Sequence, residues 1–125
     1  MSTPQKLKIY VYKSCDTCRR ALKFLDAKGV IYEAIPIREQ PPTAAELKRM
    51  LARYQGHLRK LFNTSGQDYK ALGLKDRLPL LSVEEGIQLL ASNGNLVKRP
   101  FVVTGLGGCV GFDETEWSTA EFTRC

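Results

Sequence analysis

The chain has 125 residues, of which 43% are hydrophobic and 26% charged, so we expect residues 1–125 to form one ordinary globular domain. The net charge is +6, but the basic residues are scattered without a block of five like charges, and we expect no direct nucleic-acid ligand. No apolar run approaches the roughly 20 residues that span a membrane, and the N-terminal MSTPQKLK lacks the apolar core of a signal peptide, which together favour a cytoplasmic protein.

The first third of the chain predicts a strand, a helix and a second strand. Residues 7–12 form a short run rich in Ile, Tyr and Val, which is typical of a buried strand. From about residue 16 to 28 apolar residues recur at helical spacing, and Gly29 follows where a glycine often ends a helix. Residues 30–37 predict a strand, and the short links imply a right-handed parallel βαβ unit. Three residues of this second strand are expected in the core: Ile31, Ala34 and Ile35.

A helical insertion is predicted next, over about residues 43–92. Thr43 and Glu46 have the spacing of a capping box, in which each side chain bonds the other residue's backbone at a helix start. Ser82 and Glu85 repeat this pattern before the last helix of the insertion. The stretch between these two helices is interrupted by glycines, which predicts several short helices.

The end of the chain predicts a hairpin and a short helix. Residues 101–104 and 109–112 are expected to be strands that flank a glycine-rich turn. Asp113 is expected to cap a last helix that runs through Trp117, and residues 121–125 are expected to be loose. The predicted order is therefore β-α-β, a helical insertion, and β-β-α, which is an α/β fold.

Two cysteines, Cys15 and Cys18, lie where the first strand meets the first helix, and they could bind a metal, pack, or exchange electrons. A zinc site needs four ligands, but the chain has neither a second such pair nor more than one histidine. Cys18 shares the apolar side of the helix and is expected to be buried. Cys15 is expected at the helix N-terminus, where free backbone N–H groups favour a thiolate. A thiolate with a second thiol one turn away favours redox chemistry.

The other cysteines and the single histidine are expected to take no part in chemistry. Cys109 falls in a predicted strand and is expected to be a packed core thiol, and Cys125 is the last residue. His57 lies in a polar helical stretch and is expected to face solvent.

Arg99 and Pro100 precede the strand predicted over residues 101–104. Proline cannot donate a hydrogen bond to a sheet, so Pro100 belongs at a strand start. A CxxC at the first strand–helix junction of this element order is similar to thioredoxin-like redox domains, in which a cis proline at this position faces the active cysteine. By that likeness Arg99 is expected near Cys15, where a guanidinium suits an oxyanion or carboxylate better than an ammonium does.

Four segments together resemble the arsenate reductase (ArsC)/Spx/YffB family: IYVYKSCDTCRRALKFL, PPTAAELKRML, LFNTSGQDYKALGL and LVKRPFVVTGLGG. The resemblance covers roughly residues 7–117 and implies a thioredoxin-like sheet with a helical insertion. Reductases of this family attack arsenate with one N-terminal cysteine, which matches Cys15, and use glutathione and glutaredoxin to complete the cycle. Spx-type members are redox-sensing regulators that bind the RNA polymerase α subunit, and YffB-type members resemble small thiol reductases.

The resemblance also implies which residues bind substrate. Three arginines hold the oxyanion in the best-studied reductases, and only Arg99 matches one of them. Asn63 stands in place of the second, and Gly111–Phe112 lie near the third. The loss of two charged contacts, each worth roughly 1.5–3 kcal/mol, argues against arsenate as the substrate. The expected site has no metal and consists of the substrate-binding residues Arg99, Asn63, Ser14 and Thr17, with Pro100 shaping it beside Cys15 and Cys18.

The leading hypothesis is a cytosolic thiol–disulfide oxidoreductase, with Cys15 as the nucleophile and Cys18 as the resolving thiol. Its substrate would be a small thiol compound or an oxyanion, and it would bind no cofactor. Its electrons would come from glutathione or from a dithiol protein of the glutaredoxin or thioredoxin type. The alternative is an Spx-like redox-sensing regulator that binds the RNA polymerase α subunit.

Overall fold

The computed structural model describes residues 7–105 and 107–119. It confirms the predicted element order, and the loose tail predicted over residues 121–125 lies outside the described part, as does Cys125. The elements in chain order are β1 (Leu7–Val11), α1 (Asp16–Ala27), β2 (Tyr32–Pro36), α2 (Ala44–Arg53), η1 (Leu58–Leu61), α3 (Gln67–Ala71), α4 (Leu74–Arg77), η2 (Leu78–Leu80), α5 (Val83–Ser92), η3 (Gly94–Leu96), β3 (Phe101–Thr104), β4 (Gly107–Val110) and α6 (Glu114–Thr119).

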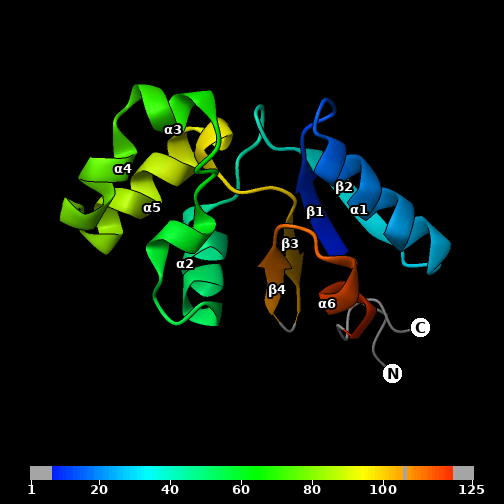
Figure 1. Ribbon diagram of the computed structural model, residues 1–125. Coiled ribbons are helices and arrows are strands. Elements are labelled where there is room, and N and C mark those ends of the chain that lie inside the picture. The colour runs from blue at the N-terminus through cyan, green and yellow to red at the C-terminus, as the bar shows by residue number, and fades with distance from the viewer. Residues whose placement is uncertain (1–6, 106, 120–125) are drawn as a thin grey trace.

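The four strands form one mixed sheet in the order β2-β1-β3-β4 (Figure 1). β1 and β2 are parallel, with Ile9 opposite Ala34, so the predicted parallel βαβ unit is confirmed. β3 runs antiparallel to β1, and β4 runs antiparallel to β3 as the second half of the hairpin. The sheet thus joins the two halves of the chain. Because β1 and β3 are antiparallel neighbours, the end of β1 lies beside the start of β3.

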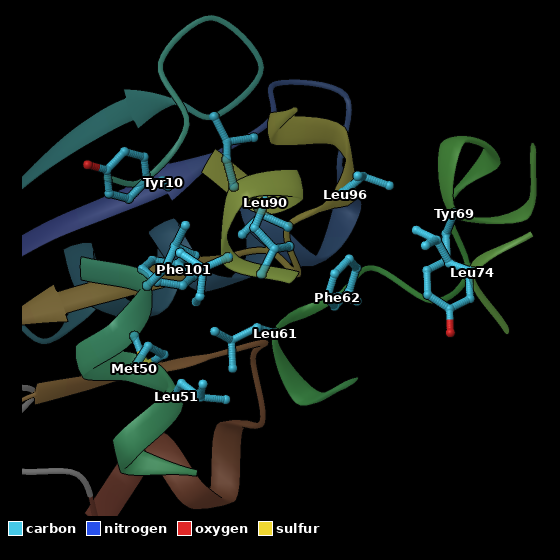
Figure 2. Packing of buried hydrophobic residues seen from close by; sticks show 14 of the residues in the cluster. Tyr10, Met50, Leu51, Leu61, Phe62, Tyr69, Leu74, Leu90, Leu96 and Phe101 are labelled. Atoms are coloured by element: carbon cyan, nitrogen blue, oxygen red, sulfur yellow. The ribbon is translucent and has the colours of Figure 1, made fainter. Parts of the chain in front are cut away.

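Helices cover both faces of the sheet (Figure 1). On one face α1 and α6 pack over the central strands, in a buried cluster that includes Ile9, Leu25, Val102 and Trp117. On the other face the helices between β2 and β3 form a larger cluster, which Figure 2 shows around Phe101, Leu61 and Leu90. No helix in residues 7–105 or 107–119 is long and apolar enough to cross a membrane.

The predicted helix starts are confirmed because each depends only on residues close together in the chain. Thr43 and Glu46 form a complete capping box at α2, and Ser82 and Glu85 form another at α5. At α6, the Asp113 Oδ1 atom accepts the backbone N–H of Glu116 at 3.0 Å.

The core residues predicted for the strand at residues 30–37, which the structure bounds as Tyr32–Pro36, are partly wrong. Ile35 is buried, but Ile31 is 74% exposed and Ala34 is exposed as well. β2 is an edge strand, and the helices on the two faces leave these residues uncovered. Apolar character alone could not show that the strand lies at the sheet edge.

The second hairpin strand is shifted from its predicted position at residues 109–112 to Gly107–Val110. Gly108 has a φ of 122°, and a Cβ on it would overlap the carbonyl oxygen of Val102 on the neighbouring strand. The glycines that indicated a turn are therefore partly strand residues, because this hairpin needs one of them where the two backbones approach closely.

Candidate active site

Cys15 is the N-cap residue of α1 and has an extended backbone conformation. Its Sγ atom accepts the backbone N–H of Cys18 at 3.4 Å, and its own backbone N–H donates to the Tyr12 carbonyl at 3.0 Å. The side chain is half-buried. The sulfur therefore lies at the free amide groups of the helix start, as predicted. The bond to Cys18 fixes the sulfur, and the bond to Tyr12 fixes the backbone of Cys15.

Cys18 lies one turn further along α1 and is only 1% exposed, which confirms its predicted burial. Burial raises the pKa of the Cys18 thiol above its ordinary value, and a hydrogen bond with Cys15 adds to the rise. A backbone hydrogen bond from Tyr12 and the positive charge of Arg99 act in the opposite direction on this pKa. Both cysteines are free thiols, one reachable and one protected.

An open pocket of about 480 Å³ lies over Cys15. Its lining includes Thr17, Asn63 and Arg99, so the structure brings three of the four predicted substrate-binding residues to the nucleophile. Ser14 is not part of this lining; its side chain is exposed and lowers the pKa of the Tyr12 hydroxyl instead. The pocket thus joins residues from α1, from the helical insertion and from the segment before β3.

Backbone hydrogen bonds explain how the chain brings Asn63 and Arg99 together. The Asn63 N–H donates to the Leu96 carbonyl, and the Lys98 N–H donates to the Leu61 carbonyl, each at 2.8 Å. The segments before α3 and before β3 therefore run side by side as a short antiparallel bridge. The sequence alone could not show this pairing, because neither segment has the pattern of a strand.

The peptide bond between Arg99 and Pro100 is cis, as the thioredoxin-like likeness predicted. The Pro100 carbonyl accepts the N–H of Gly111 at 2.8 Å, which joins this turn to the end of β4. Gly111 has a φ of 76° and lines the pocket. The proline therefore shapes one wall of the pocket together with the residues that follow the hairpin.

The guanidinium of Arg99 is placed against an aromatic ring. Its Cζ atom lies 5.0 Å from the centroid of the Tyr12 ring, and its Nη1 atom is buried without a hydrogen-bond partner among the described residues. Leaving a buried donor unpaired is unfavourable by about 1–3 kcal/mol. The ring face of Tyr12 therefore holds this guanidinium, and one of its nitrogen atoms remains unpaired within the described residues.

Several charged residues of the pocket were not predicted from the sequence. Lys98 adds a second positive charge next to Arg99, and Asp113 and Glu116 place negative charge on the lining. Lys98 stands beside Arg99 in the sequence, which was the one available signal. The acidic residues precede or lie in α6, which packs on the face of the sheet that carries α1.

Of the residues predicted to stay out of the chemistry, Cys109 and His57 are placed as expected, and Cys125 lies outside the described residues. Cys109 is 4% exposed, and burial raises the pKa of its thiol to about 12, with the charge of Glu116 adding to the rise, so it is a packed core thiol. His57 is exposed and its Nδ1 atom contacts the Tyr54 carbonyl oxygen at 2.9 Å. Within residues 7–105 and 107–119, no group of three His, Cys, Asp or Glu side chains comes together in a way that could hold a metal ion.

This chain is similar to known proteins over most of its length. The Bacillus subtilis (strain 168) protein YusI is 43% identical over 111 residues, which cover 89% of this chain and 94% of YusI. The solved structure of an ArsC family related protein from Bacteroides fragilis is 41% identical with a TM-score of 0.86, over 93% of this chain and 98% of that one. SACOL0876 from Staphylococcus aureus COL is 44% identical with a TM-score of 0.80, over the same shares.

Some of the more distant relatives are named as enzymes and others as regulators. One from Rhizobium meliloti (strain 1021) is called arsenate reductase and is 32% identical over 79% of this chain and 69% of its own length. Another, from Streptococcus mutans, is called global transcriptional regulator Spx and is 26% identical over 86% of this chain and 77% of its own length. The thioredoxin-like α/β fold with its helical insertion is shared with the solved structures. The model of the ArsC family matches residues 10–120, and the chain belongs to that family.

Proposed function

We propose that this chain is a cytosolic thiol–disulfide oxidoreductase without a bound cofactor, in which Cys15 is the nucleophile and Cys18 the resolving thiol. The arrangement of the two thiols is the main support. Cys15 is half-buried at a helix N-terminus and lines a pocket, whereas Cys18 is buried one turn away with its amide 3.4 Å from the Cys15 sulfur. This arrangement suits a thiolate that attacks a substrate and a second thiol that releases the product.

The pocket favours a small disulfide over arsenate as the substrate. The best-studied family reductases carry two further arginines, one at the position of Asn63 and one near Gly111–Phe112, and these residues of this chain line the pocket. A highly charged oxyanion would therefore meet one guanidinium, that of Arg99, instead of three. A disulfide with one or two anionic groups needs fewer positive partners, and Arg99 with the Asn63 amide can bind its polar end.

The proposed reaction has two exchange steps. The Cys15 thiolate attacks one sulfur of the substrate disulfide, so that a mixed disulfide forms and the first substrate thiolate leaves. Cys18 then loses its proton to water and attacks the Cys15 sulfur, which forms the Cys15–Cys18 bond and releases the second thiolate. A dithiol protein of the glutaredoxin or thioredoxin type, or glutathione, reduces this bond and completes the cycle.

The test is turnover of a glutathione mixed disulfide, and separately of arsenate, by the wild type and by the variants Cys15→Ser and Cys18→Ser. We expect Cys15→Ser to remove turnover of the disulfide, and Cys18→Ser to accumulate a mixed disulfide on Cys15 that mass spectrometry detects. A Cys125→Ser control should keep full activity. Wild-type turnover no faster than that of Cys15→Ser would overturn the proposal, and efficient arsenate turnover would overturn the substrate class.

A redox-sensing regulator is the second candidate function, because relatives of this chain are named Spx and regulatory protein MgsR. In that case the same pair of thiols would control binding to the RNA polymerase α subunit. A pull-down with the purified α subunit, using reduced and oxidised protein, distinguishes the two candidates. Binding that depends on the redox state of the pair, without turnover, would favour the regulator.

A further inference from the structure

Tyr12 lies next to the thiol pair and has no role in the two exchange steps proposed above. It follows β1 directly, and its carbonyl accepts the N–H of Cys15 at 3.0 Å. A backbone hydrogen bond also connects it with Cys18. The backbone of Tyr12 is therefore fixed relative to both cysteines. The point at which its side chain leaves the backbone is fixed as well.

The ring of Tyr12 is near two guanidinium groups. The Cζ atoms of Arg99 and Arg38 each lie 5.0 Å from the ring centroid. The Arg38 Nη1 atom also donates to the Tyr12 hydroxyl at 2.9 Å. The exposed Arg38 thus orients the ring through its hydroxyl, while Arg99, which lines the pocket, lies over the ring.

This way of holding Arg99 has an electrostatic consequence. A carboxylate partner would fix the guanidinium but would neutralise its charge. An aromatic face attracts a cation through its quadrupole and leaves the net charge in place. The Nη1 atom of Arg99 is buried without an acceptor in the described part of the chain, so the ring, and not a hydrogen bond to that atom, fixes this end of the side chain.

We propose that Tyr12 is a positioning residue, whose ring holds the charged guanidinium of Arg99 close enough to the thiol pair to assist the resolving step. The inference rests on the proposed function. In that step the proton of Cys18 goes to water and its sulfur attacks the Cys15 sulfur of the mixed disulfide. The Cys15–Cys18 bond forms, and the electron pair of the broken bond leaves with the substrate thiolate. A fixed positive charge stabilises both the attacking and the departing thiolate.

A single-turnover experiment separates the two steps. One equivalent of a nitrobenzoate disulfide, whose thiolate is coloured, is mixed with reduced full-length protein that carries Cys125→Ser. The first release of colour reports attack by Cys15 and the second reports resolution by Cys18. We expect Tyr12→Leu to slow the second release roughly three- to ten-fold at neutral pH and to shift its pH profile to higher pH. Tyr12→Phe, which keeps the ring, should stay within roughly two-fold of the wild type.

Two controls separate this role from a purely structural one. In an Arg99→Gln background, Tyr12→Leu should cause no further slowing, because the charge that it positions is gone. Tyr32→Leu, at a tyrosine whose hydroxyl bonds Asp26 at the other end of α1, should leave the second release unchanged. If Tyr12→Leu does not fold, Tyr12→Gln takes its place with the same expected slowing.

The outcomes distinguish this inference from the proposed function. A second release at the wild-type rate in Tyr12→Leu, or equal slowing with and without Arg99, would overturn the role of Tyr12 while the thiol chemistry stands. A wild type that gives no second release, or a Cys15→Ser variant that reacts as the wild type does, would overturn the thiol chemistry itself.

Discussion

Arg99 combines a functional position with an unfavourable environment. Its guanidinium lies beside the pocket that contains Cys15, yet one of its nitrogens is buried without an acceptor within the described residues. Residues placed for binding are often not optimal for stability, because their partners arrive only with the ligand. Activity and stability should therefore respond differently to a change at this position.

We expect Arg99→Gln to lower the rate of disulfide turnover roughly ten-fold or more, since a charge-assisted contact is lost. The free energy of unfolding should change by less than about 1 kcal/mol, because the lost contact with the Tyr12 ring is offset by removal of the unpaired buried donor. Turnover assays and urea denaturation of the same preparation test both parts. A large loss of stability would show that Arg99 has a structural role.

At this scale the sequence predicted the thiols well and their surroundings only in part. That Cys15 is more accessible than the buried Cys18 follows from the helical period, which is local information. The contact between Tyr12 and Arg99 joins residues far apart in the chain. Tyr12 was assigned to the first strand, and no pattern near it indicated a guanidinium partner.

Among the elements, α2 has a function besides covering the sheet. The Tyr54 hydroxyl accepts the N–H of Val110 at 3.0 Å, and the Arg53 Nε atom donates to the Gly108 carbonyl at 3.0 Å. Both partners lie on β4, which pairs with β3 on its other side. Side chains from the end of α2 thus occupy backbone groups that an edge strand otherwise exposes.

Tyr54→Phe should lower the free energy of unfolding by about 1–3 kcal/mol, because the Val110 N–H loses its acceptor in a partly buried place. Hydrogen exchange at the Val110 amide should become faster in the same variant. Tyr32→Phe is the matched control: its hydroxyl bonds an exposed Asp26, and its loss should change stability by less than about 0.5 kcal/mol. Equal effects of the two substitutions would contradict this account of α2.

For the elements themselves, sequence prediction succeeded where the signal is local. The capping boxes at Thr43 and Ser82 were predicted to the residue. The errors at Ile31 and Gly108 concern tertiary position: whether a strand has helices over it, and whether a second backbone approaches a glycine. Neither is encoded in the few residues around the site, so periodicity could not show it.

For the molecule as a whole, the buried ionisable groups predict how stability depends on pH. Burial raises the pKa of Tyr10, Cys18 and Cys109, the last to about 12 from an ordinary value of 9.0. The folded state therefore keeps protons that the unfolded chain releases. Their stabilising contribution is complete below the unfolded values and is lost as pH rises through the folded ones.

We expect the free energy of unfolding to fall between about pH 9 and pH 12, by up to about 1.4 kcal/mol per pH unit for each such group. Cys109→Ala should be less stable at neutral pH, because the substitution leaves space in the core. Its free energy of unfolding should fall less steeply with pH, because one proton fewer is released on unfolding. Guanidinium chloride titrations under reducing conditions at several pH values measure this slope. An unchanged slope would mean that Cys109 ionises equally in both states.

The protection of β4 by α2 leaves β2 as the remaining margin of the sheet, since no other described strand pairs with its outer side. In the described part of the fold, β2 is thus the one sheet edge at which another molecule could add a strand, which is a common route to fibrous aggregates. This edge is poorly suited to the addition of further strands, because Pro36 has no N–H to donate and Glu33 on the same strand is an exposed charge. The exposed Ile31, which directly precedes β2, therefore lies beside a sheet edge that is poorly suited to the addition of further strands.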